Sequence, residues 1–290
     1  MRSILFLLIC FCLSLTACNN NTEQAKETTG QNNESMRIVS LSGTTTEILS
    51  ALGMEQKIVG VDVTSTYPAS IQKLPKVGHN RNMSAEAIIA LDPSLVVGIT
   101  ENTKPELVQQ LRSANIKVQL YDLQSTPEGA KNLVRAVADS MGLTAKAEPI
   151  CQKIDEDLKG QLTLAKQPKV LFIYARGAGT MMVAGDHTYP NAMIGLSGGK
   201  NAVNGFEDFK PLTPEALVAA NPDVILMFDS GLQSLGGSDG LMQIPGMAQT
   251  NAGKNKQVIE MDGQFLTGFG PRTGEAIATL SKKLNEVRIP

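Results

Sequence analysis

The sequence predicts an α/β protein built from two similar lobes, and three observations carry this prediction. Short apolar runs typical of strands alternate with helical stretches along most of the chain. One phrase of helix, stop and strand occurs once in each half of the chain. A single helical stretch connects the halves, so we expect two α/β lobes with central parallel sheets, joined by one long helix and facing each other across a ligand cleft.

The repeated phrase begins at Ser84 and returns at Thr213, an offset of 129 positions. In each copy a hydroxyl side chain precedes a short apolar helix, and a glutamate, Glu86 or Glu215, occupies its second position. Asp-Pro or Asn-Pro then ends the helix, and an apolar strand follows. Solenoid repeats have periods of roughly 20 to 50 residues, so this longer offset indicates two separate lobes.

Residues 1–18 predict a targeting signal rather than part of the fold. Ile4 to Leu15 is apolar but too short to span a membrane, and Leu15-Thr16-Ala17-Cys18 resembles the lipobox of a bacterial lipoprotein. On this interpretation Cys18 becomes a lipid-bearing N-terminus. The alternative is an ordinary secretory signal with a chance cysteine. Residues 19–36 are polar and predict a flexible tether.

The two lobes are expected at residues 37–143 and 168–290, each with strands alternating with helices. Such alternation favours βαβ units and parallel sheets. The strands are predicted at 37–41, 58–61, 95–98 and 118–121 in the first lobe, and at 170–174, 181–184, 224–227 and 258–261 in the second. The clearest helices are predicted at 47–52, 126–141 and 274–287.

The connecting helix is predicted over residues 144–167. Pro149 blocks an interior hydrogen bond, which moves the expected start from Thr144 towards Ala147. One rigid helix packed on both lobes allows only small rocking, so we expect a largely preformed cleft. Its apolar side chains recur every four residues and form one stripe. The stripe consists of Ile150, Ile154, Leu158 and Leu162.

Composition argues against several classes of function. The net charge is −2, 19% of residues are charged, and no run of Lys or Arg forms the basic face that nucleic acid requires. The chain contains only two histidines and has no Gly-x-Ser-x-Gly, Walker A, His-Glu-x-x-His or Cys-x-x-Cys motif. Cys151 is the one cysteine left in the expected mature fold, so no internal disulfide can form. A binding protein is therefore favoured over an enzyme.

With its lipobox, two Rossmann-like lobes and single connecting helix, the chain resembles the cluster A-III substrate-binding proteins of ABC importers. That group serves haem, ferric siderophores, vitamin B12 and some metal ions. The haem-binding branch is the most similar, through segments 62–68, 74–78, 175–177, 236–241, 245–246 and 268–273.

The resemblance implies a monomer anchored by Cys18 at the extracytoplasmic face of the cell envelope. Haem is then the transported ligand, with no catalytic cofactor, and the partner is an ABC permease dimer. A ferric-siderophore or corrinoid binder of the same architecture is the alternative. A haem-handling or hydrolytic envelope enzyme is the alternative from another class.

Tyr67 is the expected iron ligand, because the tyrosine of the Ser-Thr-Tyr-Pro stretch is the axial ligand in the haem-binding relatives. Ferric iron is a hard acid, and a phenolate is one of the few protein groups that holds haem iron through oxygen. A tyrosine that merely packs beside a pre-proline turn is the alternative. His187 follows a strand of the second lobe and is either a second iron ligand or an exposed loop histidine.

Three arginines and a histidine are candidates for other haem contacts. Arg81 would stabilise the phenolate or pair with a propionate. Arg176 and Arg272 are flanked by glycines and could receive a carboxylate, although Arg272 could instead tie down the final helix. His79 is expected to pack at the porphyrin edge or the cleft rim.

Glu86 and Glu215 are the expected docking residues. In the cluster A-III relatives one glutamate per lobe pairs with arginines of the permease, and these two match by motif and placement. The local alternative is stabilisation of the helix dipole by about 0.3 to 1 kcal/mol, which does not exclude docking.

Overall fold

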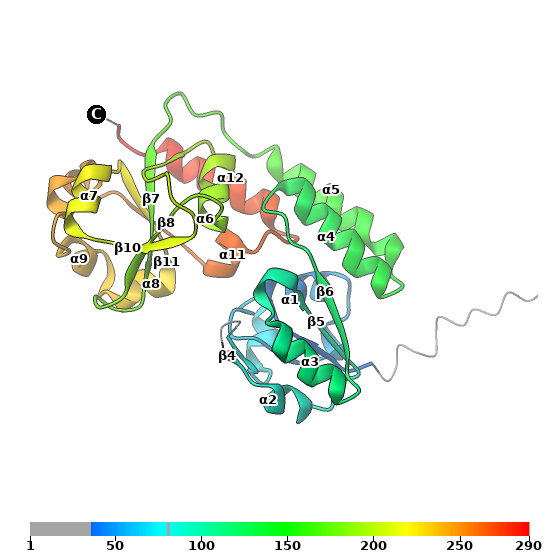
Figure 1. The fold of residues 1–290 in the computed structure, drawn as a ribbon. Coiled ribbons are helices and arrows are strands. Elements are labelled where there is room, and N and C mark those ends of the chain that lie inside the picture. Colours follow the sequence, from blue (N-terminus) through cyan, green and yellow to red (C-terminus); the bar gives the residue numbers. More distant parts are fainter. Residues whose placement is uncertain (1–35, 80–81, 290) are drawn as a thin grey trace, which may run out of the picture. The chain divides into compact units, whose positions relative to one another are not determined.

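The structure, a computed structural model, describes residues 36–79 and 82–289 (Figure 1). The predicted signal peptide, nearly all of the predicted tether, Cys18 and Arg81 lie outside the described residues. Within those ranges no helix combines the length and the apolar character needed to cross a membrane.

The first lobe contains the predicted parallel sheet, with strand order β2-β1-β5-β6. Every residue of β5 is buried, as expected for a strand in a parallel sheet that is covered on both faces. The strands are β1 (Ile38–Ser40), β2 (Ile58–Val61), β5 (Leu95–Ile99) and β6 (Lys117–Tyr121), and β3 (Gly78–His79) and β4 (Asn82–Met83) form a separate antiparallel pair. The helices are α1 (Gly43–Ala51), α2 (Ala85–Ile89), α3 (Pro105–Ser113) and α4 (Pro127–Ser140).

The second lobe contains a mixed sheet, with order β10-β8-β7-β11-β12 and β9 paired to β7. The predicted central parallel strands are present, since β9, β7, β11 and β12 pair in parallel, but β8 runs antiparallel to β7. Only residues 176–180 join these two strands, and a parallel crossover needs a dozen or more residues. The strands are β7 (Lys169–Ala175), β8 (Met181–Ala184), β9 (Lys200–Asn201), β10 (Phe209–Pro211), β11 (Val224–Phe228) and β12 (Val258–Met261). The helices are α6 (Tyr189–Leu196), α7 (Pro214–Ala220), α8 (Asp229–Ser234), α9 (Gly237–Met242), α10 (Asn251–Asn255), α11 (Gly263–Thr267) and α12 (Thr273–Asn285).

The repeated phrase forms the same local structure in both lobes, as α2 followed by β5 and α7 followed by β11. The hydroxyls of Ser84 and Thr213 each accept a hydrogen bond, 3.1 Å long, from the backbone amide three residues on. Asp92 and Asn221, which precede the prolines, have left-handed φ angles of 47° and 38°. Asp and Asn tolerate this conformation better than most residues, which explains their use as stops.

The link between the lobes is shorter than predicted. A 3₁₀ turn at Thr144–Lys146 leads into α5 (Ala147–Leu158), which starts where the sequence placed it. Pro149 lies in the first turn, where its missing N–H costs no hydrogen bond. The helix ends at Leu158 instead of reaching residue 167, because Gly160 disfavours helix and the stripe residue Leu162 is exposed.

Helix α5 packs against both α4 and α12, as Figure 1 shows. One hydrophobic cluster runs through these helices and contains Val134 from α4, Cys151 from α5 and Ile277 from α12. Cys151 is thus a buried core residue. The two lobes and α5 thus share one continuous hydrophobic core.

Candidate ligand-binding cleft

A cleft of about 790 Å³ is lined by residues from both lobes. This volume lies within the range of about 300 to 1,000 Å³ typical of small-molecule sites. Its walls begin where parallel strands end, after β1 and β2 in the first lobe and after β7, β11 and β12 in the second. Ligands of open α/β sheets bind at this edge.

The second lobe supplies most of the aromatic lining. Tyr174 and Phe228 meet edge to face with ring centroids 6.4 Å apart. Tyr189 also lines the cleft, and its ring packs against the ring of Phe269 with centroids 5.9 Å apart. The apolar part of the first lobe's wall consists of Leu41, Val63 and Leu123. The cleft therefore presents an apolar, ring-lined surface to a ligand.

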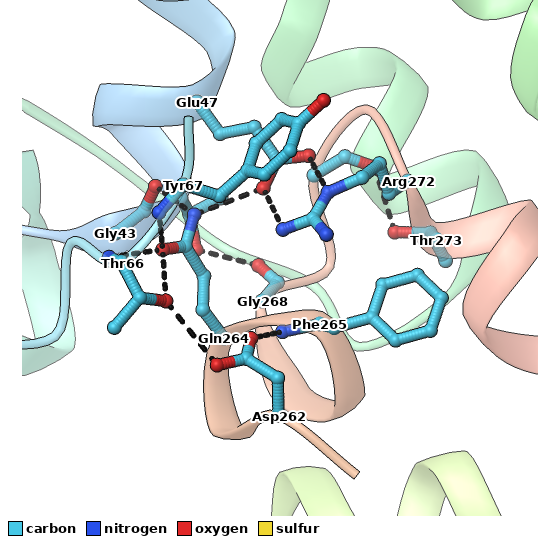
Figure 2. Close-up of polar contacts among 12 residues, drawn as sticks. Gly43, Glu47, Thr66, Tyr67, Asp262, Gln264, Phe265, Gly268, Arg272 and Thr273 are labelled. Carbon is cyan, nitrogen blue, oxygen red and sulfur yellow. Dashed lines mark hydrogen bonds and ion pairs between the residues drawn. The ribbon is translucent and has the colours of Figure 1, made fainter. Parts of the chain in front are cut away.

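Tyr67 lies beside the cleft, directly after the lining residue Thr66. Tyr67 is 45% exposed, and within the described residues its hydroxyl group takes part in no hydrogen bond. The guanidinium carbon of Arg272 lies 3.8 Å from the centroid of the Tyr67 ring. Figure 2 shows the two side chains together. The phenol is thus accessible and has a cation against its ring.

Arg272 is held by a buried carboxylate of the other lobe. Its Nε and Nη2 donate to Oε1 and Oε2 of Glu47 at 2.9 and 2.8 Å (Figure 2). Burial alone would lower the pKa of Arg272, but the hydrogen bonds and charge of Glu47 outweigh it and raise that pKa. The Arg272 side chain thereby connects the start of α12 to α1. Arg272 can therefore hold the final helix in place and also lie beside Tyr67.

The loop that carries Tyr67 is also fixed within its own lobe. The buried carboxylate of Asp62 accepts hydrogen bonds from the backbone N–H and hydroxyl of Thr64 and from the hydroxyl of Ser65. Lys76 Nζ donates to the carbonyl of Ser65 at 3.1 Å. Partial burial lowers the pKa of Lys76, and the charge of Asp62 opposes this shift.

His79 and Arg176 both line the cleft, as their predicted roles require. His79 lies in β3, at the first lobe's side. Arg176 follows β7 and is exposed, with its Nε donating to the hydroxyl of Tyr174 and its guanidinium carbon 5.8 Å from that ring's centroid. Its charge is therefore presented at the rim of the cleft.

His187 lies in an exposed turn after β8, and its side chain is 80% exposed. It is not among the residues that line the cleft, and its Nε2 is 4.0 Å from a carboxylate oxygen of Glu207. Tyr189, two residues on, does line the cleft and donates its hydroxyl to Glu101 Oε2 at 3.2 Å. Burial, followed by the charge and hydrogen bond of Glu101, raises the pKa of Tyr189. The geometry favours Tyr189 over His187 as the second-lobe side chain beside a ligand.

A sequence model of the periplasmic binding protein family matches residues 38–265. The chain belongs to this family. Membership confirms the predicted class, a binding protein rather than an enzyme, and its extracytoplasmic location.

Solved structures of similar periplasmic binding proteins share the fold. The apo form of the periplasmic heme-binding protein RhuT from Roseiflexus sp. RS-1 is 39% identical, with a TM-score of 0.83 over 87% of this chain and 98% of that one. The periplasmic heme-binding protein BhuT, solved with two hemes, is 35% identical, with a TM-score of 0.80 over 86% and 98% of the two chains.

A curated relative is named an uncharacterized ABC transporter substrate-binding lipoprotein, YvrC of Bacillus subtilis. It is 30% identical over 87% of this chain and 80% of its own length.

The two glutamates of the repeat are exposed on this periplasmic binding protein, at the second position of α2 and of α7. A hydrogen bond from its own backbone amide and one from the Ser84 hydroxyl lower the pKa of Glu86. One turn further, Ile89 and Val218 are also exposed, again 129 positions apart. Residues three apart share a helix face, so each lobe presents a carboxylate next to an apolar side chain.

Sequence reasoning missed three residues that build the site, namely Glu47, Asp62 as an anchor, and Gln264. The sequence gives one signal for Glu47, a carboxylate in an otherwise buried helix. Gln264 follows Asp262-Gly263 in no recognisable motif, and its partners are remote in sequence.

Proposed function

We propose that this periplasmic binding protein captures haem in the cleft between its lobes and delivers it to the permease of an ABC importer. The observation that carries the proposal is Tyr67, an accessible phenol at the cleft with Arg272 against its ring. When ferric iron replaces the phenol proton, the oxygen binds the metal as a phenolate. The guanidinium stabilises the negative charge of that phenolate.

The other walls suit the remaining parts of haem. The flat apolar macrocycle matches the aromatic lining from Tyr174, Phe228 and Tyr189. Arg176 at the rim is the proposed partner of a propionate, since guanidinium pairs well with carboxylate. His79 is proposed to contact the porphyrin edge, and Arg81, which lies outside the described residues, is proposed as a second cation near the ligand. Because Arg272 is already paired with Glu47, its proposed role is to stabilise the Tyr67 phenolate rather than to bind a propionate.

Haem is favoured over a ferric siderophore for a chemical reason. A phenolate is a ligand for haem iron, whereas a siderophore supplies its own ligands to iron and needs only charge complementarity from the protein. The solved relatives RhuT and BhuT, named for heme binding, support the same choice.

Two further assignments complete the proposal. Cys18 is the lipidation site that anchors a monomeric protein to the membrane at the extracytoplasmic face. Glu86 and Glu215, each with its apolar neighbour Ile89 or Val218, dock on the two equivalent halves of the permease. The equal spacing of both pairs within the repeat supports a partner that presents the same surface twice.

A titration with hemin tests the proposal, with cyanocobalamin and a ferric siderophore as competing candidates. We expect saturable binding of hemin alone, a Soret shift and a ferric-tyrosinate charge-transfer band. Tyr67→Phe keeps the ring on Arg272 and removes only the oxygen, so it should abolish the charge-transfer band. Binding of either competitor in place of hemin, or an unchanged spectrum in Tyr67→Phe, would contradict the proposal.

A further inference from the structure

We propose that Gln264 is a positioning residue that fixes the Tyr67 loop of the first lobe, residues 62–68, to the second lobe. The side chain extends from α11, is only 8% exposed, and enters the first lobe between the Tyr67 loop and the start of α1 (Figure 2). Its effect on cargo rests on the proposed function, whereas its effect on the loop does not.

The carbonyl oxygen of Gln264 holds the loop directly. Oε1 accepts hydrogen bonds from the backbone amides of Thr66, at 2.8 Å, and Tyr67, at 3.1 Å. The Thr66 hydroxyl donates to the same oxygen at 3.1 Å. Two consecutive amides of the loop are therefore satisfied by one side chain of the opposite lobe.

The amide nitrogen of Gln264 joins the second lobe to α1. Nε2 donates to the carbonyl of Gly43 and to Oε2 of Glu47, both at 2.9 Å. A reversed amide would set NH₂ against two N–H donors and oxygen against a carbonyl and a carboxylate. Only one orientation of a neutral amide satisfies all five bonds, so the site is specific for glutamine rather than glutamate.

The first lobe leaves room for this side chain through Gly43. A Cβ atom there would lie 2.9 Å from Gln264 Cδ and 2.9 Å from the carbonyl oxygen of Thr64. Such contacts are far shorter than van der Waals separation, so any larger residue would displace the glutamine or the loop.

Helix α11, which carries Gln264, is itself fixed within the second lobe. Asp262 caps α11 by accepting from the amide of Phe265 at 2.8 Å. The hydroxyl of Thr44 donates to the carbonyl of Gly268 and makes a further bond between the lobes. Gln264 is thus presented from an anchored helix, which is what a positioning role requires.

The consequence is a link between lobe separation and the iron ligand. The Tyr67 loop belongs to the first lobe by sequence, yet two of its amides depend on the second. Moving the lobes apart breaks all five bonds of Gln264 together and leaves the loop held only within its own lobe, by contacts such as those of Asp62 and Lys76. Separation of the lobes by the permease would therefore loosen the grip of Tyr67 on its cargo.

Amide hydrogen exchange of the ligand-free protein, followed by NMR, tests the positioning role. In Gln264→Met, which keeps the side-chain length and removes all five bonds, exchange at Thr66 and Tyr67 should accelerate about tenfold or more. The amide of Val61, bonded to the carbonyl of Pro75 at 3.0 Å, is the internal reference and should not change. Gln233→Met, at an exposed glutamine on α8, is the matched control.

Haem release is the second readout. Gln264→Met should still take up hemin at the wild-type stoichiometry but lose it to an excess of acceptor protein about tenfold faster. Gln264→Glu at neutral pH should act in the same direction, because its carboxylate faces Glu47 and the Gly43 carbonyl. It serves in place of the methionine variant should that variant not fold, as judged by thermal unfolding.

Unchanged exchange at Thr66 and Tyr67 in a folded Gln264 variant would overturn the proposal. Faster amide exchange with an unchanged rate of haem release would show that positioning of the loop by Gln264 does not affect haem retention. If the wild-type protein binds no hemin, the proposed function fails, and the exchange data still decide whether Gln264 positions the loop.

Discussion

The two lobes share a plan but differ at the surfaces that face the cleft. The parallel strands β2-β1-β5-β6 of the first lobe correspond to β9-β7-β11-β12 of the second, and α2 and α7 carry the same capped phrase. At the cleft the first lobe contributes the Tyr67 loop, whereas the second contributes the aromatic wall, Arg272 and Gln264. On the proposed function, the repeat persists where both lobes would meet equivalent surfaces of the permease, and it is lost where they would meet different parts of one ligand.

The largest expected effect comes from changing the repeated phrase that both lobes share. Replacing Glu86 and Glu215 together by Ala should nearly abolish haem transport through the cognate permease, because both proposed docking charges are lost. Each single variant should lose part of the activity to a similar extent. Haem binding in solution should stay at the wild-type level, since neither residue lines the cleft.

Uptake of haem by reconstituted proteoliposomes measures this effect. Glu106→Ala with Glu275→Ala is the matched control, since these are exposed glutamates in the first turns of α3 and α12. Normal uptake by the Glu86, Glu215 double variant would remove the docking role and leave only the local helix effect.

The next effect concerns what only the second lobe provides. Arg176→Gln removes the cation at the rim and should weaken hemin affinity about tenfold, because a charge-assisted hydrogen bond to a propionate is lost. Arg112→Gln, an exposed arginine on α3, is the control. Equal hemin affinity of both variants in equilibrium titrations would exclude a propionate contact at Arg176.

A smaller effect is expected at Asp92 and Asn221, the residues that end the repeated helix in each lobe. Asp92→Ala and Asn221→Ala place alanine at left-handed φ angles of 47° and 38°, which should cost about 1 to 2 kcal/mol of unfolding free energy each. Asn221→Ala should cost more, because Asn221 Oδ1 also accepts from the amide of Asn251 at 2.8 Å.

Urea unfolding measures the difference between the two stops. Asp92→Gly is the control, since glycine adopts the left-handed conformation readily, and it should recover most of the loss. A larger loss for Asp92→Ala than for Asn221→Ala would contradict this explanation.

The smallest expected effect is that of His187→Ala. The side chain is exposed and does not line the cleft, so the Soret maximum and hemin affinity should match those of the wild-type protein. A shifted Soret band would instead identify His187 as the second iron ligand and would make the two lobes share the metal.

Much of the fold could be predicted because it follows from local patterns. The strands, the capped repeat and the start of α5 at Ala147 depend on side chains within a few residues of one another. The end of α5 depends partly on Gly160, which the sequence shows, and partly on whether Leu162 finds a partner, which the sequence does not show. The antiparallel β8 also has a local signal, because the connection 176–180 is too short for a parallel crossover.

The candidate site was less predictable, because its decisive contacts join distant residues. Tyr67 was found through a resemblance, and no local pattern points to its stacking on Arg272. Gln264 and Glu47 are 217 positions apart in sequence and meet only when both lobes are assembled. A polar side chain in such a joint has no periodicity or spacing by which a sequence could reveal it.

The most direct test of the central claim is a crystal structure of the haem-loaded protein. We predict that the iron bonds to Tyr67 Oη of the first lobe, with the Gln264 bonds to Thr66 and Tyr67 intact and the porphyrin against Tyr174 and Phe228. Iron bound only by a second-lobe residue such as Tyr189 or His187, with Tyr67 still stacked on Arg272 and free of metal, would contradict the division of roles between the lobes.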